Sequence, residues 1–167
     1  MLTAQDVKRL LTLEPLVPEG GCFAETYRSR KSLPPGTLPG QPSPRPLATA
    51  IYYLLEPGTF SALHRLCADE LFHFYLGDPV EMLQLGPGAD DRLLRLGGDL
   101  AAGERPQAVV LAGTWQGTRL VAGGRWALLG TTLAPGFEVA DFELGRRAEL
   151  VARWPAQRAL IEALTRG

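Results

Sequence analysis

The two histidines of this 167-residue chain, His64 and His73, both fall within one short stretch, GTFSALHRLCADELFHFYLG (residues 58–77). Glu70 lies between them, six positions after His64. An imidazole and a carboxylate that meet in an apolar pocket can hold or move a proton near neutral pH. The same two side chains are also among the ligands of catalytic zinc and iron centres. The stretch therefore indicates acid–base chemistry or part of a metal site, with a buried structural His–Glu pair as the plain alternative.

Strand alternation separates the two histidines. Residues 60–66 and 70–76 are predicted to be strands, and within the second one Glu70 and His73 take opposite faces. If Glu70 faces a cavity, His73 faces away from it and is structural. His64 approaches Glu70 only if the chain folds back at residues 67–69.

The elements that must position these side chains are short strands. Apolar runs bounded by Gly, Pro and Asp turns follow one another without a long helical period, which is typical of a β-sandwich or barrel. The predicted strands are residues 23–29, 47–56, 60–66, 70–76, 80–85, 91–96, 107–112, 114–121, 125–134 and 137–145.

The segments outside these strands complete a predicted single domain of residues 1–167. Short helices are expected over residues 1–15 and 155–166. Residues 31–46 hold six of the 14 prolines, so they cannot join the interior of a sheet. A long surface loop is expected there.

Charge and composition restrict the classes of partner that the protein can bind. Lys and Arg number 17 and Asp and Glu number 18, so a surplus of basic side chains for nucleic acid is missing. No apolar run is long enough for a membrane helix, and residues 1–11 do not resemble a signal peptide. The two cysteines, Cys22 and Cys67, are expected to be buried thiols in a reducing compartment. These features predict a cytoplasmic protein with no nucleic-acid or membrane partner.

The spacing of four residues around His64 resembles the first motif of the cupin superfamily, which runs Gly, His-x-His, Glu, Gly. Gly58, His64, Glu70 and Gly77 match it, while Leu66 replaces the second histidine. The segment LAGTWQ resembles the second motif, with Gln116 in place of its histidine.

Further segments resemble one cupin branch that is catalogued as a domain of unknown function. The resemblance runs from about residue 15 to residue 145 and includes PEGGCFAETYRS, TAIYYLL, GERPQAVVLAGTWQ and APGFEVADFEL. It implies an all-β fold, a double-stranded β-helix or RmlC-like jelly-roll barrel, with a small-molecule ligand inside the barrel. It also implies a homodimer.

The resemblance suggests roles for individual residues. Cupin sugar-nucleotide epimerases use a histidine as base and a tyrosine as acid, so His64 is the candidate base, Glu70 its partner and Tyr27 the candidate acid. Arg28 is the candidate phosphate contact, although a plain surface strand also explains residues 27–28. The predicted ligand-binding residues are Arg28, Trp115, Gln116, Phe137 and Asp141.

The cupin metal site is only partly present. His64 and Glu70 are strong ligands, Leu66 cannot bind a metal, and Gln116 offers a neutral amide oxygen. No cofactor is therefore predicted beyond a weakly bound divalent metal.

Three functions remain open from the sequence. The first is epimerase-like or isomerase-like proton transfer on a sugar-like or nucleotide-like ligand. The second is a non-catalytic ligand-binding module, and the third is a metal-dependent oxygenase or isomerase.

Overall fold

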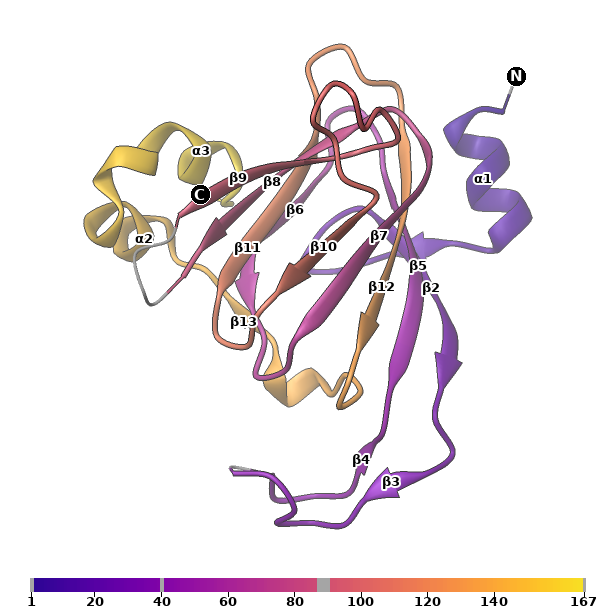
Figure 1. The fold of residues 1–167 in the computed structure, drawn as a ribbon, viewed down its shortest axis with the longest axis vertical. Helices are drawn as coiled ribbons and strands as arrows, with labels where there is room; N and C mark the ends of the chain where they lie inside the picture. Colours follow the sequence, from indigo (N-terminus) through magenta and orange to yellow (C-terminus); the bar gives the residue numbers. More distant parts are fainter. Residues whose placement is uncertain (1, 40, 87–90, 167) are drawn as a thin grey trace.

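Two antiparallel sheets face each other in the computed structural model, which describes residues 2–39, 41–86 and 91–166 (Figure 1). The six-stranded sheet has the order β1 (Glu14–Pro15), β2 (Cys22–Arg28), β5 (Thr49–Leu55), β12 (Ala127–Leu133), β7 (Glu70–Gly77) and β10 (Gln107–Val110). The five-stranded sheet has the order β13 (Glu143–Leu144), β6 (Phe60–Arg65), β11 (Trp115–Leu120), β8 (Val80–Leu85) and β9 (Arg92–Leu96). The predicted all-β, double-stranded β-helix fold is confirmed.

The main core lies between the sheets. Alternate residues of each strand point inward, so large apolar side chains of one sheet meet those of the other. Tyr53, Phe72 and Leu129 come from the six-stranded sheet, and Val80 and Met82 from the five-stranded sheet. Each is at most 2% exposed. Glu70 lies two positions before Phe72 on the same face of β7, so the core ends where the polar part of the interior begins.

Helices cover the outer faces of both sheets (Figure 1). Helix α1 (Ala4–Leu11) begins at a Thr3–Asp6 capping box and packs Val7 against Leu54 and Leu128 of the six-stranded sheet. Helices α2 (Arg147–Arg153) and α3 (Arg158–Ala163), joined by the 3₁₀ turn η2 (Pro155–Gln157), cover the five-stranded sheet. The sequence did not predict α2, which begins without a side-chain cap.

The proline-rich segment is more ordered than the predicted loop. It forms a two-stranded hairpin, β3 (Ser32–Leu33) with β4 (Arg45–Pro46), which extends away from the sheets (Figure 1). Arg45 is buried at the base of this arm and forms an ion pair with Asp141. Residue 40 lies outside the described residues.

The predicted last strand, residues 137–145, is wrong over most of its length. Residues 139–141 form the 3₁₀ turn η1 (Val139–Asp141), and only Glu143–Leu144 pair with β6. The backbone amide of Phe137 donates to the Thr49 hydroxyl at 2.9 Å, and that of Gly136 donates to the carbonyl of Pro46 at 2.8 Å. These bonds direct the chain from one sheet across to the other instead of along a strand.

The cysteines and the helix lengths bear on two further expectations from the sequence. Cys67 is exposed and Cys22 is half-buried, so the prediction of two buried thiols is wrong. Cys67 lies in the turn between β6 and β7, where its side chain reaches solvent. In the described part of the chain, every helix is too short or too polar to cross a membrane.

Candidate functional site

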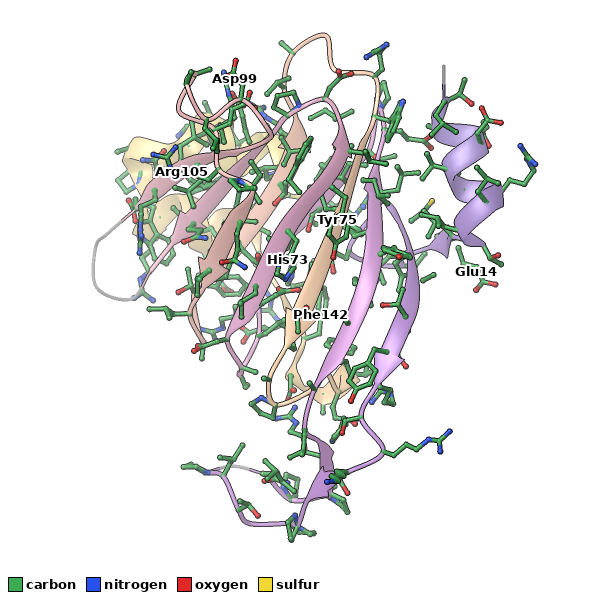
Figure 2. The ribbon with its side chains drawn as sticks, turned by 45° about the vertical axis from the view of Figure 1, so that its right-hand side comes forward. Glu14, His73, Tyr75, Asp99, Arg105 and Phe142 are labelled. Atoms are coloured by element: carbon green, nitrogen blue, oxygen red, sulfur yellow. The ribbon has the colours of Figure 1, made fainter. Side chains whose placement is uncertain are left out.

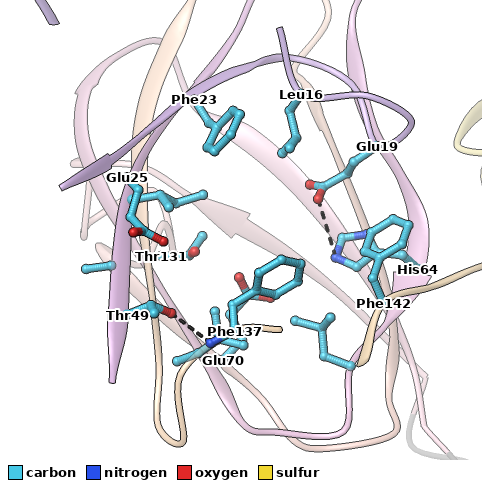
Figure 3. Close-up of a pocket in the computed structure, with 14 residues that line it drawn as sticks. Leu16, Glu19, Phe23, Glu25, Thr49, His64, Glu70, Thr131, Phe137 and Phe142 are labelled. Atoms are coloured by element: carbon cyan, nitrogen blue, oxygen red, sulfur yellow. Dashed lines mark hydrogen bonds and ion pairs between the residues drawn. The ribbon is translucent and has the colours of Figure 1, made fainter. Parts of the chain in front are cut away.

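A cavity of about 90 Å³ lies between the two sheets, next to the main core (Figure 3). Its polar lining consists of the side chains of Glu19, Glu25, Thr49, His64, Glu70 and Thr131. Its apolar lining consists of Leu16, Phe23, Ala50, Ile51, Leu66, Leu133, Phe137 and Phe142. Since a single water needs about 10–15 Å³ on this measure, the cavity has room for a small organic molecule.

His64 is held in one tautomer by the backbone. Its side chain is 3% exposed, and Nδ1 lies 2.8 Å from the carbonyl oxygen of Ala62. A carbonyl oxygen can only accept, so Nδ1 carries the hydrogen and Nε2 of the neutral ring is left with its lone pair. Phe142 stacks on the ring, with centroids 5.0 Å apart. His64 therefore presents a basic nitrogen in a fixed orientation.

Glu19 is the carboxylate that faces this nitrogen, at 3.9 Å between Oε2 and Nε2 (Figure 3). Its other oxygen, Oε1, accepts a hydrogen bond of 2.7 Å from the Ser61 hydroxyl. The Glu19 carboxylate therefore lies beside the nitrogen that would take up a proton. The sequence reasoning missed Glu19, because nothing in its spacing connects it with His64; the only signal was a carboxylate in the turn PEGG.

The loop that carries Glu19 is fixed by contacts with β6 and with the C-terminal end of the chain. Its carbonyl accepts from the amide of Ala62 at 2.9 Å, and the Arg166 guanidinium donates to the carbonyls of Pro18 and Glu19 at 3.0 Å each. Gly20 has φ +115°, and a Cβ there would collide with the carbonyl oxygen of Phe60. Only glycine fits this close approach, so the local sequence positions the carboxylate.

Glu70 lies beside His64 and shares a contact with it. The side-chain amide nitrogen of Gln116 donates to a Glu70 oxygen and lies 3.3 Å from Nε2 of His64. Glu70 is 6% exposed, and this burial, together with the charge of Glu19, raises the pKa of its carboxyl, although His64 opposes the effect. A carboxyl with a raised pKa keeps its proton more readily and can donate it.

Replacing Glu70 with glutamine should change how stability depends on pH. A raised folded-state pKa means that the folded protein binds this proton more tightly than the unfolded chain does. Wild-type stability should therefore fall as pH rises above the ordinary carboxyl value of 4.5, until the folded-state pKa is passed. Glu70→Gln should remove this fall and exceed the wild type at pH 8, as urea unfolding between pH 4 and pH 8 would measure.

The matched control is Glu149→Gln, because Glu149 is a largely exposed carboxylate at the surface of α2. It should leave the pH profile unchanged. Parallel profiles for wild type and Glu70→Gln would show that Glu70 does not titrate differently in the folded protein.

The predicted acid, Tyr27, lies outside the cavity with 55% of its surface exposed. A register shift between Glu25 and Tyr27 interrupts the alternation of β2, so Glu25 lines the cavity and Tyr27 does not. Arg28 lies near the cavity's rim, where it forms hydrogen bonds of 3.0 and 2.8 Å with Glu25. It also contacts the carbonyl of Phe137 at 3.3 Å.

Of the other predicted ligand-binding residues, one lines the cavity and three do not. Phe137 lines the cavity, whereas Gln116 is buried behind His64 and Glu70. Trp115 is the neighbour of Gln116 on β11, so it points to the opposite face and packs under α2 and α3. Asp141 does not line the cavity and instead forms the ion pair with Arg45.

His73 lies on the outer face of the six-stranded sheet, as strand alternation predicts. Its ring is parallel to that of Tyr75 with centroids 6.2 Å apart (Figure 2). Its nitrogens lie 3.4 Å from the Gln107 amide and the Thr132 hydroxyl. These contacts suit a structural residue outside the cavity.

The residues present do not fit a catalytic metal. Across residues 2–39, 41–86 and 91–166, no three His, Cys, Asp or Glu side chains are grouped to hold one. Gln116 turns its amide nitrogen, a donor, toward His64 and Glu70. Leu66 is 6% exposed in an apolar cluster with Phe137 and Phe142.

Comparisons with known proteins agree with this fold. The family model described as "Cupin superfamily (DUF985)" matches residues 5–145. The crystal structure of protein SO0799 from Shewanella oneidensis is 37% identical, with a TM-score of 0.86 and 99% of each chain covered. A hypothetical protein from Leishmania major is 29% identical, with a TM-score of 0.88 and coverage of 99% of this chain and 100% of that one.

A more distant similarity concerns the fold alone. The structure of oxalate decarboxylase from Bacillus subtilis is 13% identical, with a TM-score of 0.56 over 91% of this chain and 37% of that one. No match was found among the curated proteins.

Proposed function

The chain belongs to the cupin superfamily, in the family described as DUF985, and we propose that its cavity is an active site that moves a proton on a small organic molecule. One observation carries the proposal: the Nδ1 hydrogen bond to Ala62 leaves the lone pair of His64 Nε2 on the side that faces Glu19. A histidine base that is oriented on one nitrogen and supported by a carboxylate at the other is equipped for general base catalysis.

The proposed reaction is an epimerisation or isomerisation. Nε2 of His64 accepts a proton from a C–H bond of the ligand, and the bonding electrons pass into an adjacent carbonyl group. Glu70, whose raised pKa favours its protonated form, returns a proton to the ligand. Glu19 stabilises the imidazolium that forms. His64 then releases its proton to solvent and Glu70 takes one up from solvent, which restores both side chains. The ligand has exchanged one proton for another, so no oxidant or reductant is needed.

Cavity size and charge restrict the ligand. A cavity of about 90 Å³ suits a molecule the size of a sugar or smaller, while a nucleotide would leave most of its atoms outside. The lining includes no Lys or Arg side chain in the described part of the chain. These features support a ligand no larger than a sugar over a nucleotide-like one.

A non-catalytic binding module is the second candidate. Gln116 contacts both His64 and Glu70, which is also what a purely structural polar cluster would do. Binding of a molecule without any exchange of its protons would favour this candidate.

The test combines binding with isotope exchange. Thermal shift with a panel of small sugars, amino sugars and hydroxycarbonyl compounds should identify ligands, since a ligand that binds the folded state raises Tm. Each ligand is then incubated with the protein in D₂O, and proton NMR should show one C–H signal lost faster than without protein. Ligands that raise Tm while every C–H signal persists would contradict proton transfer and support the binding module.

A further inference from the structure

The charged groups that line the cavity are mostly acidic. Glu19, Glu25 and Glu70 contribute carboxyl groups, and His64 is the one basic side chain in the lining formed by the described residues. If His64 is protonated and Glu70 also keeps its proton, the Glu19–His64 pair is neutral and Glu25 is balanced by Arg28. In every other protonation state of His64 and Glu70 the lining is negative. A carboxylate or phosphate would therefore find no unbalanced positive charge.

Arg28 is the nearest candidate for binding an anion, and its guanidinium is already engaged. It forms two hydrogen bonds with Glu25, at 3.0 and 2.8 Å, and further ones of 3.3 and 3.4 Å with the Phe137 carbonyl and a Glu138 oxygen. A carboxylate ligand would have to compete with two carboxylates of the protein. Such an Arg–carboxylate pair is a strong, geometrically specific interaction.

The cavity also contains a hydroxyl group with spare acceptor capacity. Thr131 is 3% exposed and lines the cavity from β12. Its oxygen has no partner at normal hydrogen-bond geometry among the described residues, although it lies close enough to Glu70 to lower the pKa of that carboxyl. Buried hydroxyl groups normally have a well-placed partner, so this one indicates that a polar group of a ligand belongs nearby. An ammonium group suits the site because it has several N–H donors and no acceptor.

The remaining walls suit the body of an organic cation. Phe23, Phe137 and Phe142 present aromatic rings, which attract a positive charge placed near their faces (Figure 3). Leu16 and Leu133 add aliphatic surface. An inorganic cation would need several oxygen ligands instead of this apolar lining.

We infer that the cavity binds a small organic ammonium ion, a positively charged nitrogen on an apolar or weakly polar body, in preference to carboxylates and phosphates. The inference rests on the proposed function because it concerns the same cavity, and it names the class of substrate. Glu19 and Thr131 accept hydrogen bonds from the ammonium group, and the aromatic rings contact its carbon atoms.

The test uses three probes with the same carbon skeleton: 3-methylbutylammonium, 3-methylbutan-1-ol and 3-methylbutanoate. Isothermal titration calorimetry with the purified protein measures the binding of each. The ammonium probe should bind at least about tenfold more tightly than the alcohol, through its charge-assisted hydrogen bonds and the aromatic rings. The carboxylate should bind most weakly. Equal or tighter binding of the carboxylate, or no measurable binding of the ammonium, would overturn the inference.

Two variants locate the preference within the cavity. Glu19→Gln should weaken ammonium binding by about tenfold and leave alcohol binding unchanged, since only a charge is removed. Thr131→Val, which keeps the shape of the side chain, should weaken ammonium binding a few-fold. Glu138→Gln is the matched control, because its carboxylate lies outside the cavity and should not affect either probe. An unchanged ammonium preference in both cavity variants would contradict the inference.

The inference and the proposed function can fail separately. The probes undergo no reaction, so their binding reports the charge preference alone, whereas deuterium exchange reports proton transfer. Ammonium binding without exchange in any amine ligand would leave a cation-binding module. Exchange in a carboxylate ligand would preserve proton transfer and refute the ammonium preference.

Discussion

Replacing His64 with glutamine should slow deuterium exchange in a bound ligand by about 10²–10⁴-fold, the usual contribution of a general base. The amide of glutamine can occupy part of the space of the ring and can hydrogen-bond to Ala62, but it cannot accept a proton near neutral pH. The rate of exchange, measured by proton NMR in D₂O at saturating ligand, is the quantity to compare. Binding of the ligand should change much less than the rate, because the cavity keeps most of its lining.

The other histidine provides the matched control. His73→Gln removes an imidazole from the outer face of the six-stranded sheet, where it contacts Gln107 and Thr132 rather than the cavity. Its exchange rate should equal that of the wild type. A His64→Gln protein that binds and exchanges the ligand at the wild-type rate would show that His64 is not the base.

Replacing Asp141 with asparagine should lower the free energy of unfolding by about 3–5 kcal/mol, because removing one partner leaves a buried charge without compensation. The Asp141 carboxylate forms an ion pair with Arg45, and the two side chains are only 13% and 10% exposed. Urea unfolding monitored by circular dichroism measures the loss.

Two comparisons test whether the lost stability comes from the unpaired buried charge. The Arg45→Met, Asp141→Leu protein should recover much of the stability, because apolar side chains of similar size can replace a buried ion pair. Glu149→Gln removes one partner of the exposed Arg146–Glu149 pair and should cost less than about 1 kcal/mol. If Asp141→Asn cost no more than Glu149→Gln, the Arg45 pair would be as weak as a surface contact.

Alternation within strands was enough to predict several orientations. It placed Glu70 and His73 on opposite faces of β7, and the structure agrees. The same rule applied to β11 would have separated Trp115 from Gln116, since neighbours in a strand face opposite sides. Both had been predicted to contact the ligand, but Trp115 packs under the C-terminal helices.

The errors arose where regular alternation ends. A register shift in β2 separates the exposed Tyr27 from Glu25, and such a bulge leaves little trace in a single sequence. Residues 139–141 leave the expected strand because contacts with Thr49 and Arg45 hold the segment, and these partners are too distant in sequence to be foreseen. Glu19 was missed for the same reason: its loop is distant from His64 in sequence and meets it only through the tertiary fold.

The last turn of the chain and the cavity are mechanically connected. Arg166 donates hydrogen bonds to the carbonyls of the Glu19 loop. The carbonyl of Leu164 accepts a hydrogen bond from the amide of Leu63, the residue before His64. Trp154 lies in the same apolar cluster as Leu164, outside the cavity lining. If an occupied cavity shifts the Glu19 loop, a protein in which Trp154 is the one remaining indole should show it as a change in fluorescence, without an added label. Trp115 and Trp126 would have to be replaced first, because the chain holds three tryptophans.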